Sequence, residues 1–439
     1  MNKLICCSIV LAGVSAFADP SIKPASVKLS QAPNRLVTIE YEVQNEPAIV
    51  TVDILTNGVS IGAENFVAGL SGAANRLVAV GKHRVTWRPD RTWEGHVFEH
   101  AEVKASVTAW ATNQPPDYMA VDLVAADKVF FYTSTNALPK PLSDDSWRRD
   151  WLLLRKIPAA NVAWRMGAAS TQPGSVGSGI DYSANEIPHY VTLTEDYFLG
   201  VFEATYAQCV NIGTVSSAGH GSDTAKYRAQ DAGDLIAAVD CKMADLRGNW
   251  QALQPITDGS FFGKLRAKAS GKILFDLPTD AQWEFACRAG QGTGLYSGEE
   301  ISEDNRYKDN SLEVRLDRLG WYSQNSELEI ASANVRTPHR VGEKDPNGYG
   351  LYDMLGNAGE MCRDWFSSGA SYSDGSDEID PLQETAGSHL LRGGSFAATA
   401  RQCRCAYREA CGTGGTLSAG FRVYCPVNMG EMVPFPPVQ

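Results

Sequence analysis

The first part of the chain alternates apolar and polar residues with a period of two. The pattern is clearest in "RLVTIEYEV", "AIVTVDIL", "RLVAVGKHRVTW" and "AEVKASVTAW", and turn residues such as "QNEP" and "TNG" separate these segments. This alternation predicts short strands with one buried face, and several such strands at regular spacing indicate a β-sandwich. We therefore expect an all-β sandwich domain over residues 19–112, in which no motif points to catalysis.

The pattern changes after this region. Residues 113–150 are mixed in character, and "ALPKPLSDD" is typical of a loop, so we interpret them as a connector. From residue 151 onward, short strand patterns and short helical patterns are interleaved, which predicts an α+β domain over residues 151–427. Residues 428–439 form a tail.

Two helix starts carry the same signature. Thr205 with Gln208, and Thr279 with Gln282, form T-x-x-Q capping boxes. The second helix, "DAQWEFACRAG", repeats apolar residues at i, i+3 and i+4, which predicts one buried face. Cys287 lies on that face, and we expect it to point into the core.

The N-terminus resembles a secretory signal peptide. "MNKLICCSIVLAGVSAFADP" has a basic start, a short apolar run and a small-residue cleavage site, so residues 1–18 are predicted to be removed. The run is too short to span a membrane, and no other stretch approaches that length. We expect an exported protein, periplasmic or extracellular, with no transmembrane segment in the mature chain.

Composition narrows the choice of function. The chain has 439 residues, which suggests two domains, and its formal net charge of −12 makes nucleic-acid binding a poor candidate. Eight cysteines remain after the predicted cleavage, and all of them lie from Cys209 onward. Cysteines in an exported chain are typical of disulfides, although the sequence alone does not pair them.

Four ordered motifs resemble one known family. "LPTDAQWEFACRAG", "WYSQNS", "PNGYGLYDMLGNAGEMCRDW" and "LLRGGSF…CRCAYR…GFRV" together resemble the formylglycine-generating enzyme (sulfatase-modifying factor) family over roughly residues 151–427. The resemblance implies a C-type-lectin-like fold with little regular secondary structure, held by calcium and disulfides. One implied disulfide joins Cys287 to Cys405.

The resemblance also implies metal ligands. In "DMLGNAGE", the positions that match calcium ligands are Asp353, Gly356, Ala358 and Glu360, the middle two through their carbonyls. Calcium takes six to eight oxygen ligands, many of them from the main chain, which suits this glycine-containing loop. The alternative is a solvated turn. A second family site matches Asn325 and the carbonyl of Ser326, but its remaining ligands are not identified.

The copper site of the family's oxidases is only partly matched. The resemblance places two copper-binding cysteines, five positions apart, after "GGS". In one register, the first of these positions is Ala398, which cannot bind copper, and Cys403 stands at the second. In the alternative register, "RCAYR" is aligned with the family's "RCAAR", and Cys405 then matches the cysteine of the implied disulfide. In neither register is a cysteine pair present at the spacing of the enzymes. We therefore expect copper to be absent, and Cys403 is only a weak catalytic candidate. "GNAGEM" also lacks the two tryptophans that family members commonly show.

These observations leave three functions open. The first is a non-catalytic, calcium-stabilised domain that binds a protein or glycan, with Ser395, Arg401, Arg404 and Arg408 as ligand-binding candidates, because arginines suit carboxylate or sulfate groups. The alternative for these arginines is that they hold the domain's own acids and loop carbonyls. The second function is an active oxidase that converts a sulfatase cysteine to formylglycine. The third is a structural envelope module.

Overall fold

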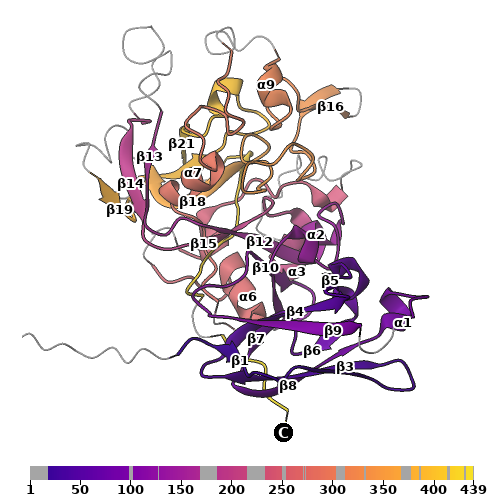
Figure 1. Ribbon diagram of the computed structural model, residues 1–439. Helices are drawn as coiled ribbons and strands as arrows, with labels where there is room; N and C mark the ends of the chain where they lie inside the picture. Colours follow the sequence, from indigo (N-terminus) through magenta and orange to yellow (C-terminus); the bar gives the residue numbers. More distant parts are fainter. Residues whose placement is uncertain are drawn as a thin grey trace, which may run out of the picture. The chain divides into compact units, whose positions relative to one another are not determined.

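The protein is described by a computed structural model (Figure 1), whose described residues are 18–97, 102–126, 128–168, 185–214, 233–249, 254–269, 271, 273–302, 312–330, 333–366, 377–384, 387–412, 416–429 and 432–438. The chain divides into two compact units. Unit 1 comprises Met1–Ile61, Gly69–Thr112 and Pro434–Gln439, and unit 2 comprises Gly62–Ala68 and Asn113–Val433.

Unit 1 consists mainly of two antiparallel sheets. The first has the order β1-β3-β8-β6, with β2 also pairing with β3, and the second has the order β5-β4-β7, with β9 also pairing with β4. Strand β9 of the second sheet contacts β1, β2 and β3 of the first. The bounds are β1 (Ser21–Ile22), β2 (Lys28–Gln31), β3 (Val37–Gln44), β4 (Ala48–Thr56), β5 (Val59–Ser60), β6 (Leu70–Gly72), β7 (Arg76–Val78), β8 (Gly81–Trp87), α1 (Pro89–Thr92) and β9 (Val103–Trp110).

The predicted alternation is visible in unit 1. Along β3, Ile39, Tyr41 and Val43 are buried, and the residues between them are more exposed. Strand β8 pairs with β3 in register and buries Val85 and Trp87 in the same way. Burial of every second side chain on paired strands is what a two-layer β-structure requires.

Unit 2 combines several small sheets with short helices. A five-stranded sheet has the order β11-β10-β12-β15-β23, a three-stranded sheet β13-β14-β19 and a four-stranded sheet β21-β20-β18-β22, while β16 pairs with β17. The strand bounds are β10 (Tyr118–Asp122), β11 (Val129–Tyr132), β12 (Trp151–Ile157), β13 (Val162–Met166), β14 (His189–Leu193), β15 (Tyr197–Gly200), β16 (Glu327–Ile330), β17 (Ala333–Arg336), β18 (Gly359–Phe366), β19 (Glu378–Ile379), β20 (Ser388–Arg392), β21 (Arg408–Cys411), β22 (Ala419–Gly420) and β23 (Tyr424–Pro426).

The helices of unit 2 within the described residues are short. They are α2 (Ser146–Arg149), α3 (Tyr206–Ile212), α5 (Met243–Arg247), α6 (Phe261–Lys268), α7 (Asp280–Arg288) and α9 (Val314–Asp317), and the 3₁₀ turns of the chain are η1 (Ala63–Asn65), η2 (Val67–Gly69), η3 (Thr135–Ala137), η4 (Gly233–Leu235) and η5 (Ala400–Gln402). This mixture of strands and few helices, preceded by a β-rich region, confirms the predicted fold class. Among the described residues, no helix combines the length and apolar character needed to cross a membrane.

Both predicted capping boxes are present. The Thr205 and Thr279 hydroxyls accept hydrogen bonds from the backbone N–H groups of Gln208 and Gln282, and each glutamine side chain accepts one from its threonine N–H. Helix α7 lies in the core, and Cys287 is fully buried as predicted. The helix ends at Arg288, and Ala289 after it adopts the left-handed conformation.

Residues 113–150 differ from a simple connector. They contain β10, β11 and α2, and β10 lies between β11 and β12 inside the five-stranded sheet of unit 2. Tyr118, Met119, Ala120 and Val121 are all buried, so this strand lacks the alternation that marks a half-exposed strand in the sequence.

Candidate functional site

The arginine of "RGGSF" lies at the centre of a buried charge network in unit 2. Arg392 has no exposed side-chain surface, and its guanidinium contacts the carboxylates of Asp280 and Glu284, both on helix α7. Its Nη1 also donates to the carbonyl oxygens of Cys405 and Tyr407, at 3.0 and 2.9 Å. One arginine thereby joins strand β20, helix α7 and residues 401–411, which contain three cysteines and are called the cysteine-rich segment below.

Two further arginines of this network are also paired with its acids. Arg288 lies 2.7 Å from Glu284. Burial alone would raise the pKa of Glu284, but the positive charges of Arg288 and Arg392 lower it to about 2. Arg408 lies 2.9 Å from the second Asp280 oxygen and is itself buried. Because each buried charge has an opposite partner, the network is a structural clamp.

The predicted ligand-binding residues therefore occupy different environments. Arg404 is buried and forms a two-pronged pair with Glu186, at 2.7 and 2.8 Å. Ser395 is also buried, and its hydroxyl accepts a hydrogen bond from the Ala397 N–H at 3.3 Å. Arg401 is exposed. The placement of Arg404 and Arg408 favours the alternative in which they hold the domain's own acids.

The predicted calcium loop contains a buried carboxylate, that of Asp353, which is only partly hydrogen-bonded. Asp353 is 1% exposed and adopts a left-handed backbone conformation, with φ at 56°. One of its oxygens accepts a hydrogen bond from the Gly342 N–H at 2.6 Å, and the other, Oδ1, is buried with no hydrogen-bond partner among the described residues. Burial raises the pKa of Asp353 to about 6.

The loop itself can only be made with glycine at one position. Gly356 has φ at 84°, and a Cβ there would lie 2.2 Å from the Trp321 carbonyl oxygen. The Gly356 N–H donates to the Gly393 carbonyl at 2.8 Å, so the loop is fixed against the "GGS" segment.

The second carboxylate of the loop is already paired. Glu360 lies 2.7 Å from Arg422, the arginine of "GFRV", and also accepts a hydrogen bond from the Trp283 indole at 2.7 Å. Arg422 further donates to the carbonyls of Gly200 and Tyr352. This arginine therefore joins the loop to strand β15.

A third carboxylate was missed by the sequence analysis. Glu203 is buried, and its oxygens accept hydrogen bonds from the Asn357 amide and the Ala358 N–H, at 2.6 and 2.8 Å. Burial, followed by the nearby charges of Asp353 and Glu360, raises its pKa well above the ordinary value. A single acid within the apolar run "YFLGVFEATY" is the sequence signal that could have identified it.

No three His, Cys, Asp or Glu side chains of the described residues converge into a metal-binding group. A cation at the loop would therefore depend on backbone carbonyls as well as on Asp353. At the second predicted site, the Asn325 side chain bonds to Tyr322, Asp317 and Gly320, and the Ser326 carbonyl accepts from Thr337 and His339. A cation there would have to replace these internal partners.

The two cysteines of the implied disulfide are buried. Cys287 and Cys405 are in hydrogen-bonding contact, which lowers the pKa of Cys405, while burial raises the pKa of Cys287. Both are thiols in this structure, as are all eight cysteines of the described chain. Their contact is compatible with the implied disulfide, which stays a prediction.

Cys403 is fully buried and belongs to the same hydrophobic core as Ala398. Its sulfur closes the space beside the second glycine of "GGS", because a Cβ at Gly394 would lie 2.6 Å from it. The sulfur is thus enclosed by protein, and the neighbouring position 398 offers only a methyl group.

Comparison with known proteins assigns this chain to a family. A family model described as "Sulfatase-modifying factor enzyme 1-like domain" matches residues 158–425. The formylglycine-generating enzyme of Streptomyces coelicolor is 32% identical over 142 residues, covering 32% of this chain and 41% of that enzyme. The serine/threonine-protein kinase pkn1 of Chlamydia pneumoniae is 26% identical over 260 residues, covering 57% of this chain and 36% of the kinase.

Among solved structures, Treponema denticola variable protein 1 matches with a TM-score of 0.43 at 22% identity, covering 63% of this chain and 95% of that protein. The chain spans less than half the length of the two curated relatives named above. This chain is similar in sequence to formylglycine-generating enzymes, and because the family model covers more than half of the chain, the protein belongs to the sulfatase-modifying factor family.

Proposed function

We propose that this protein is a sulfatase-modifying factor family member without copper–cysteine oxidase chemistry, and that its family domain binds a protein or glycan. The single observation that carries this proposal is the identity and burial of the residues at positions 398 and 403, which match the two copper-binding cysteines of the oxidases. A soft Cu(I) ion needs two thiolates, and here one position is an alanine while the other sulfur is fully buried. If no ligand is found, the structural envelope module is the function that remains.

The intact "RGGSF…GFRV" frame does not argue for the oxidase. Arg392 and Arg422 are fully buried and hold Asp280, Glu284 and Glu360. A clamp of this kind is needed for folding whether or not the domain performs chemistry, so its presence favours neither function.

Restoring the missing thiol tests the copper part of the proposal. The mature chain and an Ala398→Cys variant are titrated with Cu(I) against a chromophoric chelator. We expect the natural chain to leave the chelator–copper complex intact and the variant to remove one equivalent of copper. A Cys403→Ser/Ala398→Cys double variant is the matched control and should lose the gain. Strong Cu(I) binding by the natural chain that depends on Cys403 contradicts the proposal.

The exposed part of the cysteine-rich segment is the proposed contact surface. Arg401 is exposed, and beside it the Gln402 amide donates to the Tyr407 hydroxyl at 3.0 Å, with both side chains half-buried. The exposed Arg401 guanidinium suits a sulfated or carboxylated sugar or an acidic peptide. An array of sulfated, carboxylated and neutral glycans together with acidic peptides tests this surface.

We expect binding to at least one anionic probe and loss of that binding in Arg401→Ala. Arg318→Ala, which removes another exposed arginine of unit 2, is the matched control and should bind normally. Binding that is the same in both variants would place the contact elsewhere, and absence of binding to every probe would favour the structural module.

Calcium is proposed as a structural ion at the loop of Asp353, Gly356, Ala358 and Glu360. The support is the buried Asp353 oxygen, which has no hydrogen-bond partner within the described parts of the chain, together with three buried carboxylates, counting Glu203, close to Arg422. Excess negative charge in a buried place is relieved by a cation or by protons. Calcium would supply charge balance and fix the loop, with no part in a reaction.

Calcium removal tests this part. Thermal unfolding is followed with calcium and with a chelator, and we expect a lower midpoint after chelation in the natural chain. Asp353→Asn should have the same midpoint under both conditions, because it lacks the required carboxylate. A natural chain whose midpoint does not respond to chelation, and which contains no calcium by elemental analysis, would exclude the ion.

Export and the Cys287–Cys405 disulfide also belong to this proposal. They are supported by the N-terminal pattern and by the contact between the two buried thiols. N-terminal sequencing of protein recovered outside the cytoplasm should begin at Asp19, and recovery of uncleaved protein only from the cytoplasm would contradict export.

A further inference from the structure

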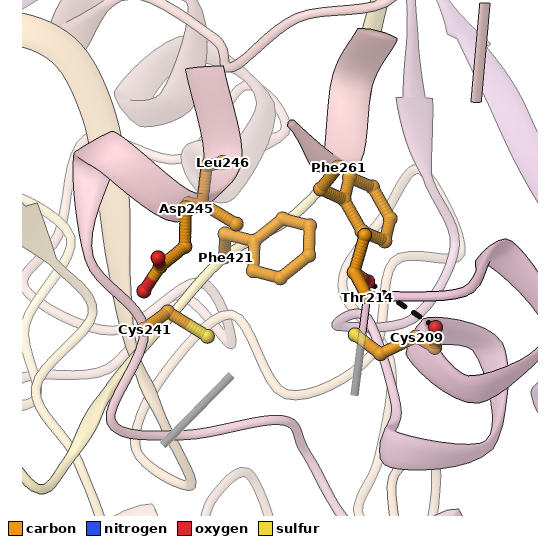
Figure 2. A pocket seen from close by; sticks show the side chains of 7 residues that line it. All are labelled: Cys209, Thr214, Cys241, Asp245, Leu246, Phe261 and Phe421. Atoms are coloured by element: carbon orange, nitrogen blue, oxygen red, sulfur yellow. Dashed lines mark hydrogen bonds between the residues drawn. The ribbon is translucent and has the colours of Figure 1, made fainter. Parts of the chain in front are cut away.

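A small pocket in unit 2 is one feature outside the site described above. Figure 2 shows the sulfur atoms of Cys209 and Cys241 on opposite sides of it, and Phe261 and Phe421 supply aromatic walls. The Cys241 thiol donates to the Ala238 carbonyl at 3.6 Å. This thiol is thus accommodated by the fold itself, and the pocket belongs to the core packing of unit 2.

The outer edge of strand β7 in unit 1 is a different kind of feature, because it accepts a segment that is distant in the sequence. One side of β7 pairs with β4, and on the other side Phe435 forms a parallel bridge with Val78. The Phe435 N–H donates to the Leu77 carbonyl at 2.9 Å, and its carbonyl accepts from the Ala79 N–H at 3.0 Å. Residues 434–438, called the tail strand below, therefore extend the sheet at this edge.

Two further contacts fix the tail strand in place. The Arg76 guanidinium lies over the Phe435 ring, 4.6 Å from its centroid. Further along, the Val438 N–H donates to the Lys82 carbonyl of strand β8 at 2.8 Å. The edge therefore holds its occupant through backbone hydrogen bonds and through one cation–π contact that requires an aromatic side chain.

The prolines of the tail strand suit an edge position. Successive residues of an extended strand face opposite sides, so Pro434 and Pro436 turn away from β7, and neither has an N–H group to donate. The tail strand thus closes the sheet against a further strand on its outer side. Pro437 lies beside Gly81, where a Cβ would stand 3.0 Å from the proline Cβ, so the glycine leaves room for the ring.

We infer that the outer edge of β7 is a docking site for the tail strand, and that it accepts this strand either from its own chain or from a second copy. The contacts are identical in the two cases, which is the condition for exchanging an element between copies. Only residues 430–433 connect the tail strand to Met429, whose carbonyl accepts from the Leu274 N–H in unit 2. A short connector limits closure on the same chain, so a second copy can compete.

Disulfide trapping tests docking from a second copy. One full chain carries Lys82→Cys and the other carries Val438→Cys, because both residues are exposed and their backbones are hydrogen-bonded to each other. The two chains are refolded together, oxidised gently and separated without reduction. We expect a covalent dimer that contains one chain of each kind.

Two controls make this result decisive. A single chain with both changes should close the bond within itself, which shows that the two positions can react. A mixture in which Arg84→Cys, also exposed on β8, replaces Lys82→Cys should give a several-fold lower yield of dimer. If the doubly changed chain closes its bond but the mixture gives no more dimer than the Arg84→Cys control, the inference is overturned.

A fluorescent peptide of residues 432–439 provides a second measurement. It is titrated into the full chain carrying Phe435→Ala, whose own tail strand lacks the ring. We expect saturable binding that weakens about tenfold when the chain also carries Arg76→Ala, or when the peptide carries Phe435→Ala. The natural chain, whose edge is occupied, should bind the peptide more weakly. Absence of binding to a Phe435→Ala chain that still unfolds cooperatively, or equal binding of both peptides, contradicts the inference.

Discussion

At the scale of single residues, unit 2 is organised around buried charges. Arg392 and Arg422 each contact acids and carbonyls from segments far apart in the sequence. Burial of such charges is unfavourable unless each has an oppositely charged partner. Removing one member therefore leaves an uncompensated charge in the core, which destabilises the folded state. This explains the arginines of "RGGSF" and "GFRV" without reference to catalysis.

Replacing Arg392 tests this explanation. Arg392→Met leaves Asp280 and Glu284 with fewer partners in the core, and we expect a loss of about 3–5 kcal/mol in unfolding free energy. Arg318→Met is the matched control, because the Arg318–Glu299 pair is exposed and worth about 1 kcal/mol or less. Chemical denaturation measures both, and equal losses in the two variants would contradict the buried-network account.

His389 predicts a dependence of stability on pH. Its ring stacks on Trp365 at 4.4 Å, and burial lowers its pKa to about 4. As pH falls from about 6.5 to 4, the unfolded chain gains a proton at this residue while the folded chain does not, so stability is lost across this window. His389→Phe removes this contribution.

Unfolding free energies at pH 7 and pH 4 should therefore fall less in His389→Phe than in the natural chain. The value at pH 7 serves as the control for folding of the variant. Identical losses between the two pH values in both proteins would show that His389 does not contribute.

At the scale of elements, the sequence predicted those features that depend on neighbouring residues alone. Both capping boxes and the buried face of α7 follow from residues within one or two helical turns. The end of α7 has no such signal, because the chain turns into the left-handed conformation at Ala289, φ 46°, one residue before Gly290. Strand β10 was missed because it is buried on both faces, which removes the alternation.

Thr279→Ala tests the role of the cap. The Thr279 hydroxyl accepts the Gln282 N–H, and without it the first turn of α7 loses one partner, so we expect a loss of about 1 kcal/mol. Thr279→Ser retains the hydroxyl and should lose much less. Chemical denaturation distinguishes the two, and equal losses would assign the effect to the lost methyl packing.

At the scale of the whole chain, the two units are not consecutive segments. The last residues return to unit 1, where Phe435 N–H donates to the Leu77 carbonyl and Ala79 N–H donates to the Phe435 carbonyl. The Phe435 ring also lies under the Arg76 guanidinium, at 4.6 Å. Pairings between distant segments such as this one, and the salt bridges of Arg392, have no local signature, so the sequence could identify their members only through family resemblance.

Deleting residues 434–439 tests the role of the tail. The deletion removes the backbone hydrogen bonds of Phe435 with Leu77 and Ala79 and that of Val438 to Lys82, and we expect unit 1 to lose about 3 kcal/mol of stability or less. Calorimetry should show a lower midpoint for unit 1. Phe435→Ala, which keeps the backbone bonds, should lie between the deletion and the natural chain, and an unchanged transition after deletion would contradict the account.

We propose that this family member lacks the oxidase chemistry of the formylglycine-generating enzymes. The most direct measurement incubates the purified mature protein with copper, oxygen and a peptide containing Cys-x-Pro-x-Arg, and follows the peptide by mass spectrometry beside an active formylglycine-generating enzyme. We predict that the peptide cysteine stays unchanged with this protein and is converted by the active enzyme. Conversion of the cysteine to an aldehyde by this protein, abolished in Cys403→Ser, would contradict the claim.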